Sequence, residues 1–184
     1  PLSLARLDNE HKMVVLKLGT TQPGEMGEMI QAIQPEVGVI THVDHYRMDR
    51  FDSLEQFAQE AGQLIAHLSP TGLAALNYDN DLVRELPTRA QKMTFGTERF
   101  GADLMAYNIV PGPSGTGFDL RCGSDRQVGR WMPLLGKHQL FSIMAALAVG
   151  QHYDVPLDKG LKALSELKPL PGQMNPLSGI NNSL

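Results

Sequence analysis

Residues 37–76 read VGVITHVDHYRMDRFDSLEQFAQEAGQLIAHLSPTGLAAL, and their pattern decides the fold. Val37–Thr41 is a short, uncharged, largely β-branched run, which is typical of a strand buried on both faces. Ser53 is a good N-cap residue, and apolar residues follow it at the three- and four-residue spacing of an amphipathic helix. Gly72–Leu76 is a second apolar run. A strand, a helix and a strand in this order predict a parallel pair with a right-handed crossover.

The same pattern extends to both sides of this stretch. Upstream, Met13–Leu18 (MVVLKL) predicts another buried parallel strand, and Pro23-Gly24 predicts the start of a helix. Downstream, Gln91–Phe95 predicts a fourth strand. The first half of the chain therefore predicts a parallel sheet with helices packed on it.

Further along the chain the pattern changes. Three strand-like runs follow one another with only PGPSG and GSD turns between them: Asp103–Val110, Thr116–Cys122 and Gln127–Met132. Strands joined by such short turns pair antiparallel. Helical patterns return after Gly136 and over Pro156–Leu167. The predicted fold class is α/β: a mostly parallel sheet flanked by helices, with a small appended antiparallel three-stranded meander.

Composition excludes several classes of protein. The 184 residues fit one domain, and a formal net charge of −4 argues against a nucleic-acid or anionic-membrane partner. A single cysteine, Cys122, excludes a disulfide framework and a cysteine-based zinc cluster. The first residues lack the basic and apolar regions of a signal peptide, so we expect a cytoplasmic location.

No standard catalytic motif occurs in the chain, so the candidate site rests on position in the fold. Ligands of open α/β sheets bind beyond the carboxyl ends of the strands, which here means the loops Gly19–Gly24, His42–Asp52 and Asn77–Asp81. The second loop holds two histidines and three carboxylates within eleven residues. These side chains are either ligands of a divalent metal or the ordinary charges of a solvated loop.

Two further features have both a functional and a structural interpretation. Lys17 interrupts an apolar run, so it either points into a site or reaches solvent at the sheet edge. The segment Gly136–Gln139 precedes a helix, so it either binds an anion or simply caps the helix. Trp131, alone in its strand, is expected in the core. Asn77 and its neighbours at a strand end form a turn unless a ligand binds there.

Six segments of the chain follow the order of one family's motifs. They are LKLGTTQPGEMGEM (16–29), VGVITHVDHYRMDRFDSLEQFAQEAGQLI (37–65), GLAALNYDND (72–81), GTGFDL (115–120), GKHQLFSIMAALAVG (136–150) and LKPLPGQMNP (167–176). Together they resemble the central, ATP-binding domain of the Mur ligases, the amide-forming enzymes of peptidoglycan assembly. The resemblance is strongest to the branch that adds D-alanyl-D-alanine to a UDP-MurNAc-tripeptide.

The resemblance implies a partial central domain over residues 1–184. Its parallel part would span 1–96, its meander 103–133, and its helices with a return to the sheet 136–184. The family's P-loop would lie upstream of residue 1, and its C-terminal domain would follow residue 184. The missing parts of the parent ligase, or a second copy of the chain, are the expected protein partners.

Several departures from the family motifs fall at its site positions. The family's magnesium-associated glutamate corresponds to Lys17, its metal-binding histidine to Arg47, and its carbamylated lysine to Ala61. Asp44 and His45 could supply metal ligands only if the loop alignment shifts by two residues. The resemblance assigns nucleotide-binding positions, two of them substituted, to Asn77, His138, Gln139 and Ser142. Its Arg-Met-Glu becomes Gln173-Met174-Asn175.

These substitutions bear directly on metal binding. Magnesium needs oxygen ligands, and neither an ammonium nor a guanidinium supplies one. A lysine charge about 4.5 Å from Mg²⁺ would repel it by roughly 7 kcal/mol at an effective dielectric constant of about 20. Because phosphoryl transfer depends mainly on positioning and electrostatics, losing the metal and the P-loop together should abolish it.

Two functions therefore remain open. The chain is a fragment or decayed relative of an ATP-dependent amide ligase that acts on a UDP-MurNAc-peptide, and it is inactive alone. Alternatively, it is a non-catalytic binding or scaffold module with a metal-free anion site formed by Lys17 and Arg47. The intact family would use ATP and magnesium, whereas we expect no cofactor for this chain.

Overall fold

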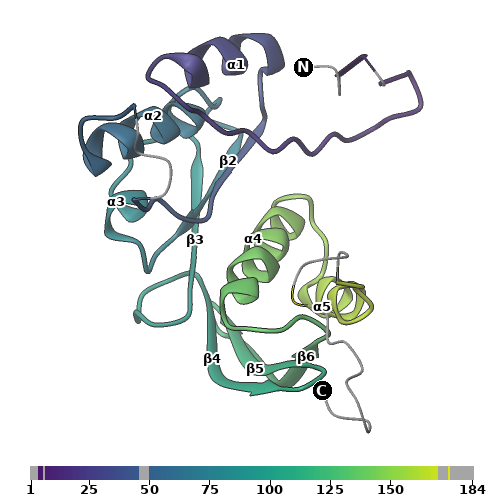
Figure 1. The fold of residues 1–184 in the computed structure, drawn as a ribbon. Helices are drawn as coiled ribbons and strands as arrows, with labels where there is room; N and C mark the ends of the chain where they lie inside the picture. Colours follow the sequence, from purple (N-terminus) through teal and green to yellow (C-terminus); the bar gives the residue numbers. More distant parts are fainter. Residues whose placement is uncertain (1–3, 6, 46–49, 170–173, 175–184) are drawn as a thin grey trace, which may run out of the picture.

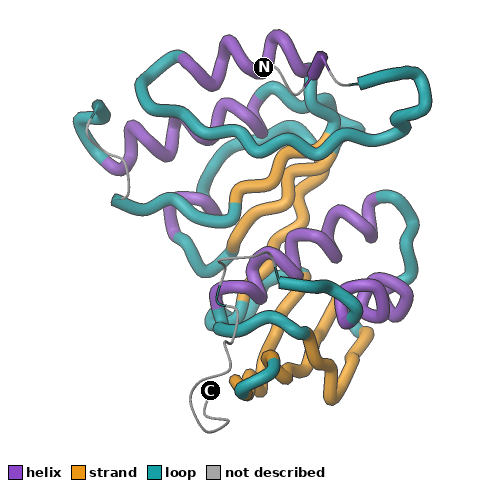
Figure 2. The backbone as a smooth tube through the Cα atoms, turned by 45° about the vertical axis from the view of Figure 1, so that its right-hand side comes forward, coloured by secondary structure: helices purple, strands orange, loops and turns teal. Residues whose placement is uncertain are grey.

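The computed structural model describes residues 4–5, 7–45, 50–169 and 174, and these contain one six-stranded mixed sheet (Figures 1 and 2). The strand order follows the chain, β1-β2-β3-β4-β5-β6. Parallel pairing joins β1 through β4, and antiparallel pairing joins β4 through β6. The strands are β1 (Val37–Ile40), β2 (Leu73–Asn77), β3 (Gln91–Gly96), β4 (Leu104–Gly112), β5 (Gly115–Cys122) and β6 (Asp125–Met132).

The antiparallel strands continue the parallel sheet instead of forming a separate one. β4 pairs with β3 through two residue pairs only, Phe95 with Leu104 and Gly96 with Met105. It then pairs with β5 along most of its length. The sequence predicted the antiparallel pairing of β4, β5 and β6. It did not predict the parallel pairing of β3 with β4, because two residue pairs are too few to produce a sequence pattern.

The predicted strand Met13–Leu18 is absent. These residues are extended but unpaired, and the Met13 and Val15 side chains are 61% and 93% exposed. A β-branched run becomes a strand only where a neighbouring strand accepts its hydrogen bonds, and no described strand lies beside this one. We call residues 7–18 the N-terminal arm; it is the purple segment that extends away from α1 (Glu25–Ile33) in Figure 1.

The helices follow the sequence prediction closely. The Ser53 side chain accepts a hydrogen bond from the Gln56 N–H at 3.1 Å, which confirms the predicted N-cap of the second helix. A helix of four residues was missed; it begins after Asn80, whose side chain caps it. The helices after α1 are α2 (Leu54–Ala66), α3 (Asp81–Arg84), α4 (His138–His152) and α5 (Leu157–Ser165).

Two apolar clusters cover the two faces of the sheet, and β2 shows the alternation most clearly. Ala74 and Leu76 face the cluster beneath α2 and α3, whereas Leu73 and Ala75 face the cluster beneath α4. The α4 cluster also takes side chains from β3 to β6 and from α5. Because helices cover both faces of the parallel part of the sheet, β2 is buried at every position and apolar on both faces, as the sequence predicts. No helix among the described residues is long and apolar enough to cross a membrane.

Trp131 does not belong to the core. Its side chain is 46% exposed, and its ring lies over Gly115 on the outer face of the meander, where a Cβ on that glycine would come 2.6 Å from the ring. The inward positions of β6 are taken by its neighbours, Arg130 opposite Phe118 and Met132 opposite Thr116. The register between β5 and β6 shifts after Phe118, and this shift decides which side chains of β6 face inward. The alternation of residues in the sequence does not predict the shift.

Candidate functional site

The loops at the carboxyl ends of β1 and β2 are tied together by Asn77. Its side-chain amide donates to the Thr41 carbonyl at 2.8 Å, and its oxygen accepts from the Asp79 N–H at 2.9 Å. The residue is 1% exposed. Both ends of the amide are therefore used within the chain, where they fix the spacing of the two loops.

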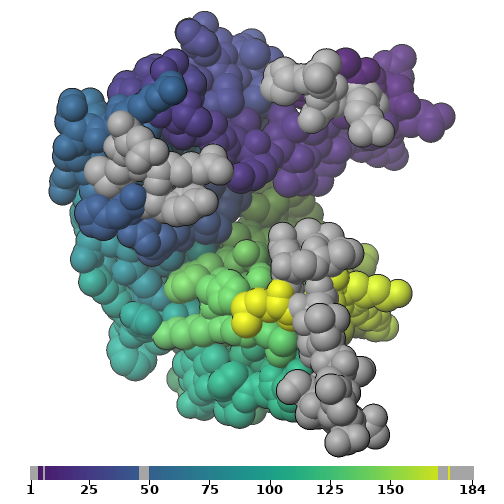
Figure 3. Space-filling model, viewed as in Figure 1, coloured from purple at the N-terminus to yellow at the C-terminus, as the bar shows by residue number. Residues whose placement is uncertain are grey.

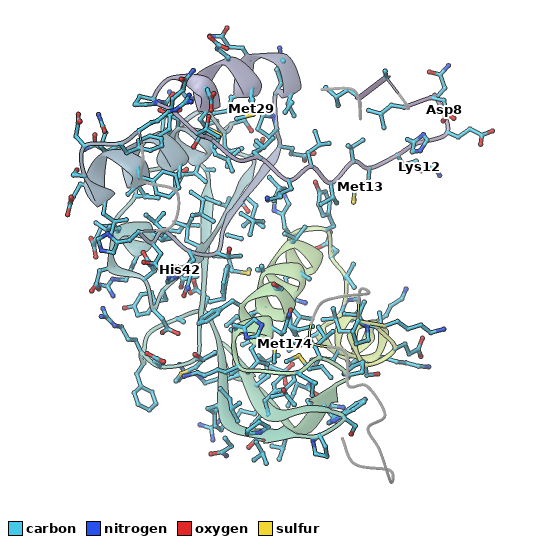
Figure 4. The ribbon with its side chains drawn as sticks, in the orientation of Figure 1. Asp8, Lys12, Met13, Met29, His42 and Met174 are labelled. Carbon is cyan, nitrogen blue, oxygen red and sulfur yellow. The ribbon has the colours of Figure 1, made fainter. Side chains whose placement is uncertain are left out.

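Asn80 makes a second tie between the same loops. Its amide donates to the Val43 carbonyl at 2.9 Å, and its oxygen caps α3 by accepting from the Val83 N–H at 3.1 Å. The amide nitrogen also lies 3.3 Å from Nδ1 of His42. Figure 4 shows His42 at this end of the sheet, near α3.

Asp79 fills a cradle of backbone donors formed by the segment after β3. Its carboxylate accepts from the N–H groups of Thr97, Glu98 and Arg99 at 2.6, 3.1 and 3.0 Å. Successive N–H groups of this kind form an anion-binding concavity. Gly96 allows the close approach, because a Cβ there would lie 2.7 Å from the Asp79 carboxylate. The Asp79 carboxylate thus fixes the segment after β3 to the loop after β2.

Ion pairs extend this network toward α4. The Asp81 carboxylate pairs with Arg99 and Arg84, and its hydrogen bond from Arg99 is the main reason that the pKa of Asp81 is lowered. Glu98 accepts from Lys137 Nζ at 2.7 Å, just before α4. The segment 97–99 therefore connects the loop after β2 to the amino end of α4.

The loop Gly19–Gly24 is closed by two carboxylates. Glu25 accepts from the N–H groups of Thr21 and Gln22 at 2.6 and 3.3 Å, and the first of these bonds is the main cause of its lowered pKa. Glu60 of α2 is 4% exposed and accepts from the Met26 N–H at 2.8 Å.

Two further contacts complete this arrangement. The other Glu60 oxygen accepts from Gln63 Nε2 at 3.0 Å. Arg50 Nη1 donates to Gln22 Oε1 at 3.1 Å, so the structure brings the first and second candidate loops together.

The predicted metal positions do not form a ligand set among the described residues. Lys17 is exposed and forms no ion pair with a described acid, and Ala61 offers only a methyl group. Among the parts of the chain that the structure describes, no three His, Cys, Asp or Glu residues gather as metal ligands. Arg47, Asp49, Gln173 and Asn175 lie outside the described residues.

The alternative metal pair, Asp44 and His45, is also engaged internally. One Asp44 oxygen accepts from the His45 N–H at 2.6 Å, and the other lies 3.6 Å from His42 Nε2. Magnesium prefers several oxygen ligands, and this donor set offers one carboxylate that already has partners. The described residues therefore do not fit a magnesium ion.

The predicted nucleotide positions on α4 lie at its amino end. His138, Gln139 and Ser142 occupy its first turns, and Gln139 Nε2 is 3.3 Å from His138 Nε2. No side chain caps this end of the helix within the described residues. Figure 4 places Met174 beside it, and its Cε lies 3.8 Å from where a Cβ of Gly136 would be. Nucleotide binding by Asn77 and these residues stays a prediction.

Sequence reasoning missed two sets of contacts near the candidate loops, those of Asp79 and those of Glu60. The Asp79 contacts join residues 18 to 20 positions apart in a loop, and no periodic pattern predicts them. Glu60 did leave a signal, since it falls three residues after Phe57 and four before Leu64 on the apolar side of α2. An acid at such a position indicates a buried partner.

Comparison with known proteins gives a consistent result. Residues 1–150 match the family model of the Mur ligase middle domain. The UDP-N-acetylmuramoyl-tripeptide–D-alanyl-D-alanine ligase of Escherichia coli is 28% identical over 187 aligned residues, covering 100% of this chain and 41% of the relative. A UDP-N-acetylmuramoyl-L-alanyl-D-glutamate–2,6-diaminopimelate ligase of Chlamydia caviae is 31% identical over 153 aligned residues. The alignment covers 82% of this chain and 31% of the relative.

A solved structure has the same fold. The crystal structure of MurF from Acinetobacter baumannii superposes with a TM-score of 0.87 at 23% identity, covering 98% of this chain and 40% of that one. A MurF structure from Thermotoga maritima in complex with ADP gives a TM-score of 0.71 over 84% of this chain and 36% of that one. The chain thus spans between 31% and 41% of the length of these relatives.

Proposed function

The chain belongs to the Mur ligase family, and we propose that it is the middle domain of an ATP-dependent amide ligase of peptidoglycan precursor synthesis, or of a protein descended from one. The proposed substrate class is a UDP-MurNAc-peptide, and the proposed location is the cytoplasm. The observation that carries the proposal is the match to a tripeptide–D-alanyl-D-alanine ligase over the whole of this chain.

We propose further that this chain does not carry out the ligation alone. Acyl-phosphate formation depends on charge stabilisation around the transferred phosphate. Lys17 and Ala61, at positions where the resemblance expects metal-associated residues, cannot supply oxygen ligands to a metal there. Each 1.36 kcal/mol of lost transition-state stabilisation costs about tenfold in rate.

Calorimetry and a phosphate-release assay test this proposal. The 184-residue chain should bind ATP–Mg²⁺ more weakly than about 1 mM, which corresponds to roughly 4 kcal/mol of binding free energy. It should release no phosphate from ATP in the presence of a UDP-MurNAc-tripeptide and D-alanyl-D-alanine. Micromolar ATP affinity, or turnover by the chain alone, would contradict it.

One observation favours the second candidate, a scaffold with a preference for anions. Lys17 is exposed and has no acidic partner among the described residues, so its charge is available to a phosphate or carboxylate. A crystal soaked in sulfate should then show an anion within hydrogen-bond reach of Lys17 Nζ, and Lys17→Gln should remove it. A soak that leaves the Lys17 side chain without an anion would count against this candidate.

A further inference from the structure

Two carboxylates lie at the start of α1, and both are hydrogen-bonded within the chain. Glu25 turns back on the loop before the helix and accepts two N–H groups. Glu60 reaches the same helix end from α2 and accepts the Met26 N–H. The orphan donors of a helix amino end attract anions, and here the chain's own acids supply them.

Glu60 is the more constrained of the two acids. It is 4% exposed, and both of its oxygens have partners, at 2.8 Å on α1 and 3.0 Å within α2. A buried carboxylate is stable only when its oxygens are bonded in this way. A cation bound by Glu60 would therefore have to share a nearly buried carboxylate with the Met26 N–H and the Gln63 amide.

From these contacts we infer that the described residues around the start of α1 and after β1 hold no divalent cation and that Glu60 fixes α1 to α2 directly. The neighbouring position, Ala61, offers no ligand, and Asp44 is engaged by the loop that carries it. This inference depends on the observed contacts and on family membership. It does not depend on the proposed ligation, so failure of either one leaves the other standing.

Manganese binding tests the first half of the inference. Titration of the 184-residue chain with Mn²⁺, followed by electron paramagnetic resonance, should show no stoichiometric site tighter than 1 mM. Addition of EDTA or 5 mM Mg²⁺ should leave the Tm unchanged. A micromolar site abolished by Glu60→Ala, or by Asp44→Asn, would overturn the inference.

Variants of Glu60 test the second half. Glu60→Ala should lower the Tm by roughly 5 °C, because it leaves the buried Met26 N–H without an acceptor. Mg²⁺ should not restore this loss. Glu60→Gln keeps an oxygen that can accept the Met26 N–H, so it should lower the Tm by less than half as much as Glu60→Ala. Glu55→Ala removes an exposed acid from the same helix and should change the Tm by about 1 °C at most.

Three results would contradict the direct tie. They are an equal effect of the Ala and Gln variants, rescue of Glu60→Ala by Mg²⁺, and a drop for Glu55→Ala as large as that for Glu60→Ala. The first would show that the acceptor oxygen is not what matters. The second would show that a cation can make the connection.

Discussion

Asp79 illustrates how polar residues in this domain are used. A side chain at the carboxyl end of a parallel sheet is in the position where ligands usually bind. Asp79 instead accepts three consecutive N–H groups of its own chain. Asn77 and Glu60 are likewise satisfied internally. At this edge the described polar residues organise the loops themselves.

Replacing Asp79 should be costly for this reason. Asp79→Ala leaves the N–H groups of Thr97, Glu98 and Arg99 without their acceptor and should lower the free energy of unfolding by about 1–3 kcal/mol. Urea denaturation followed by circular dichroism measures the loss. Glu166→Ala, an exposed acid beyond α5 with no described side-chain partner, serves as the control. Equal midpoints for the two variants would refute the role of the cradle.

Residue-level prediction succeeded where the interaction is local. The Ser53 cap joins residues three positions apart, and its signal is the residue type followed by an apolar stripe. Lys17 illustrates the opposite case, since its exposure follows from the arm being unpaired, which depends on the rest of the sheet. Trp131 was misplaced because a bulge decides which face of β6 it occupies.

At the scale of elements, β2 begins in close contact with the connection between α1 and β1. A Cβ on Gly72 would lie 2.4 Å from the Glu36 carbonyl oxygen, and a backbone atom cannot move aside as a side chain can. Gly72→Ala should therefore lower the free energy of unfolding by about 1–3 kcal/mol. Gly19→Ala has no neighbour within 4 Å of the new methyl and should cost far less. Chemical denaturation of both variants makes the comparison, and similar losses would contradict it.

The meander has a clasp at its centre. Asp119 of β5 accepts from Asn108 Nδ2 on β4 at 2.7 Å and from the Gly129 N–H on β6 at 2.8 Å, and both partners have positive φ. One carboxylate therefore holds the irregular positions of two neighbouring strands. The Gly129 bond, followed by the Asn108 bond, lowers the pKa of Asp119.

The clasp should make stability depend on pH. Because the pKa of Asp119 is lower in the folded chain, its contribution is complete above the unfolded value of about 3.9 and is lost as pH falls through the folded value. The wild-type chain should exceed Asp119→Asn in urea midpoint at pH 7, and the difference should shrink below about pH 4. A difference that stays constant from pH 7 to pH 3 would exclude the ionised clasp.

The elements themselves were largely predictable, with one instructive exception. The sequence predicted the helices that begin at Glu25, Leu54 and His138 from the spacing of their apolar residues. For the first two, a start signal before the helix supported the prediction. Met13–Leu18 is a largely apolar run with two adjacent valines, and yet it forms no strand. Strand propensity measures fit to a neighbouring sheet, and sequence cannot show whether that neighbour is present.

At the scale of the whole molecule, the two edges of the sheet differ. β6 carries charged residues and an irregular register, which protect an edge from pairing, whereas β1 (VGVI) carries neither. The exposed N-terminal arm lies on the same half of the molecule as β1, and Figure 3 shows the surface hollowed between this purple segment and the green and yellow helices. An unprotected edge and the exposed apolar residues Met13, Val14 and Val15 of the arm favour association between copies.

Light scattering should therefore show self-association that increases with concentration. Val15→Lys, at a 93% exposed position of the arm, should weaken it, because a charge opposes pairing. Val128→Lys makes the same change at an exposed position of β6 and should have little effect. A monodisperse wild-type monomer at high concentration would refute the prediction. Equal effects of the two variants would show that the arm does not form the contact between copies.

Because of its position, Trp131 can be used to measure whether the two halves of the sheet unfold cooperatively. It is the only tryptophan, so selectively excited tryptophan fluorescence reports the outer face of the meander alone, while circular dichroism reports all the helices. Only two residue pairs join the meander to the parallel strands, which by itself would let the halves unfold separately. The α4 cluster, however, includes side chains from β2 through β6, so neither half has a complete core alone. The fluorescence and dichroism transitions in urea should therefore coincide as one two-state event.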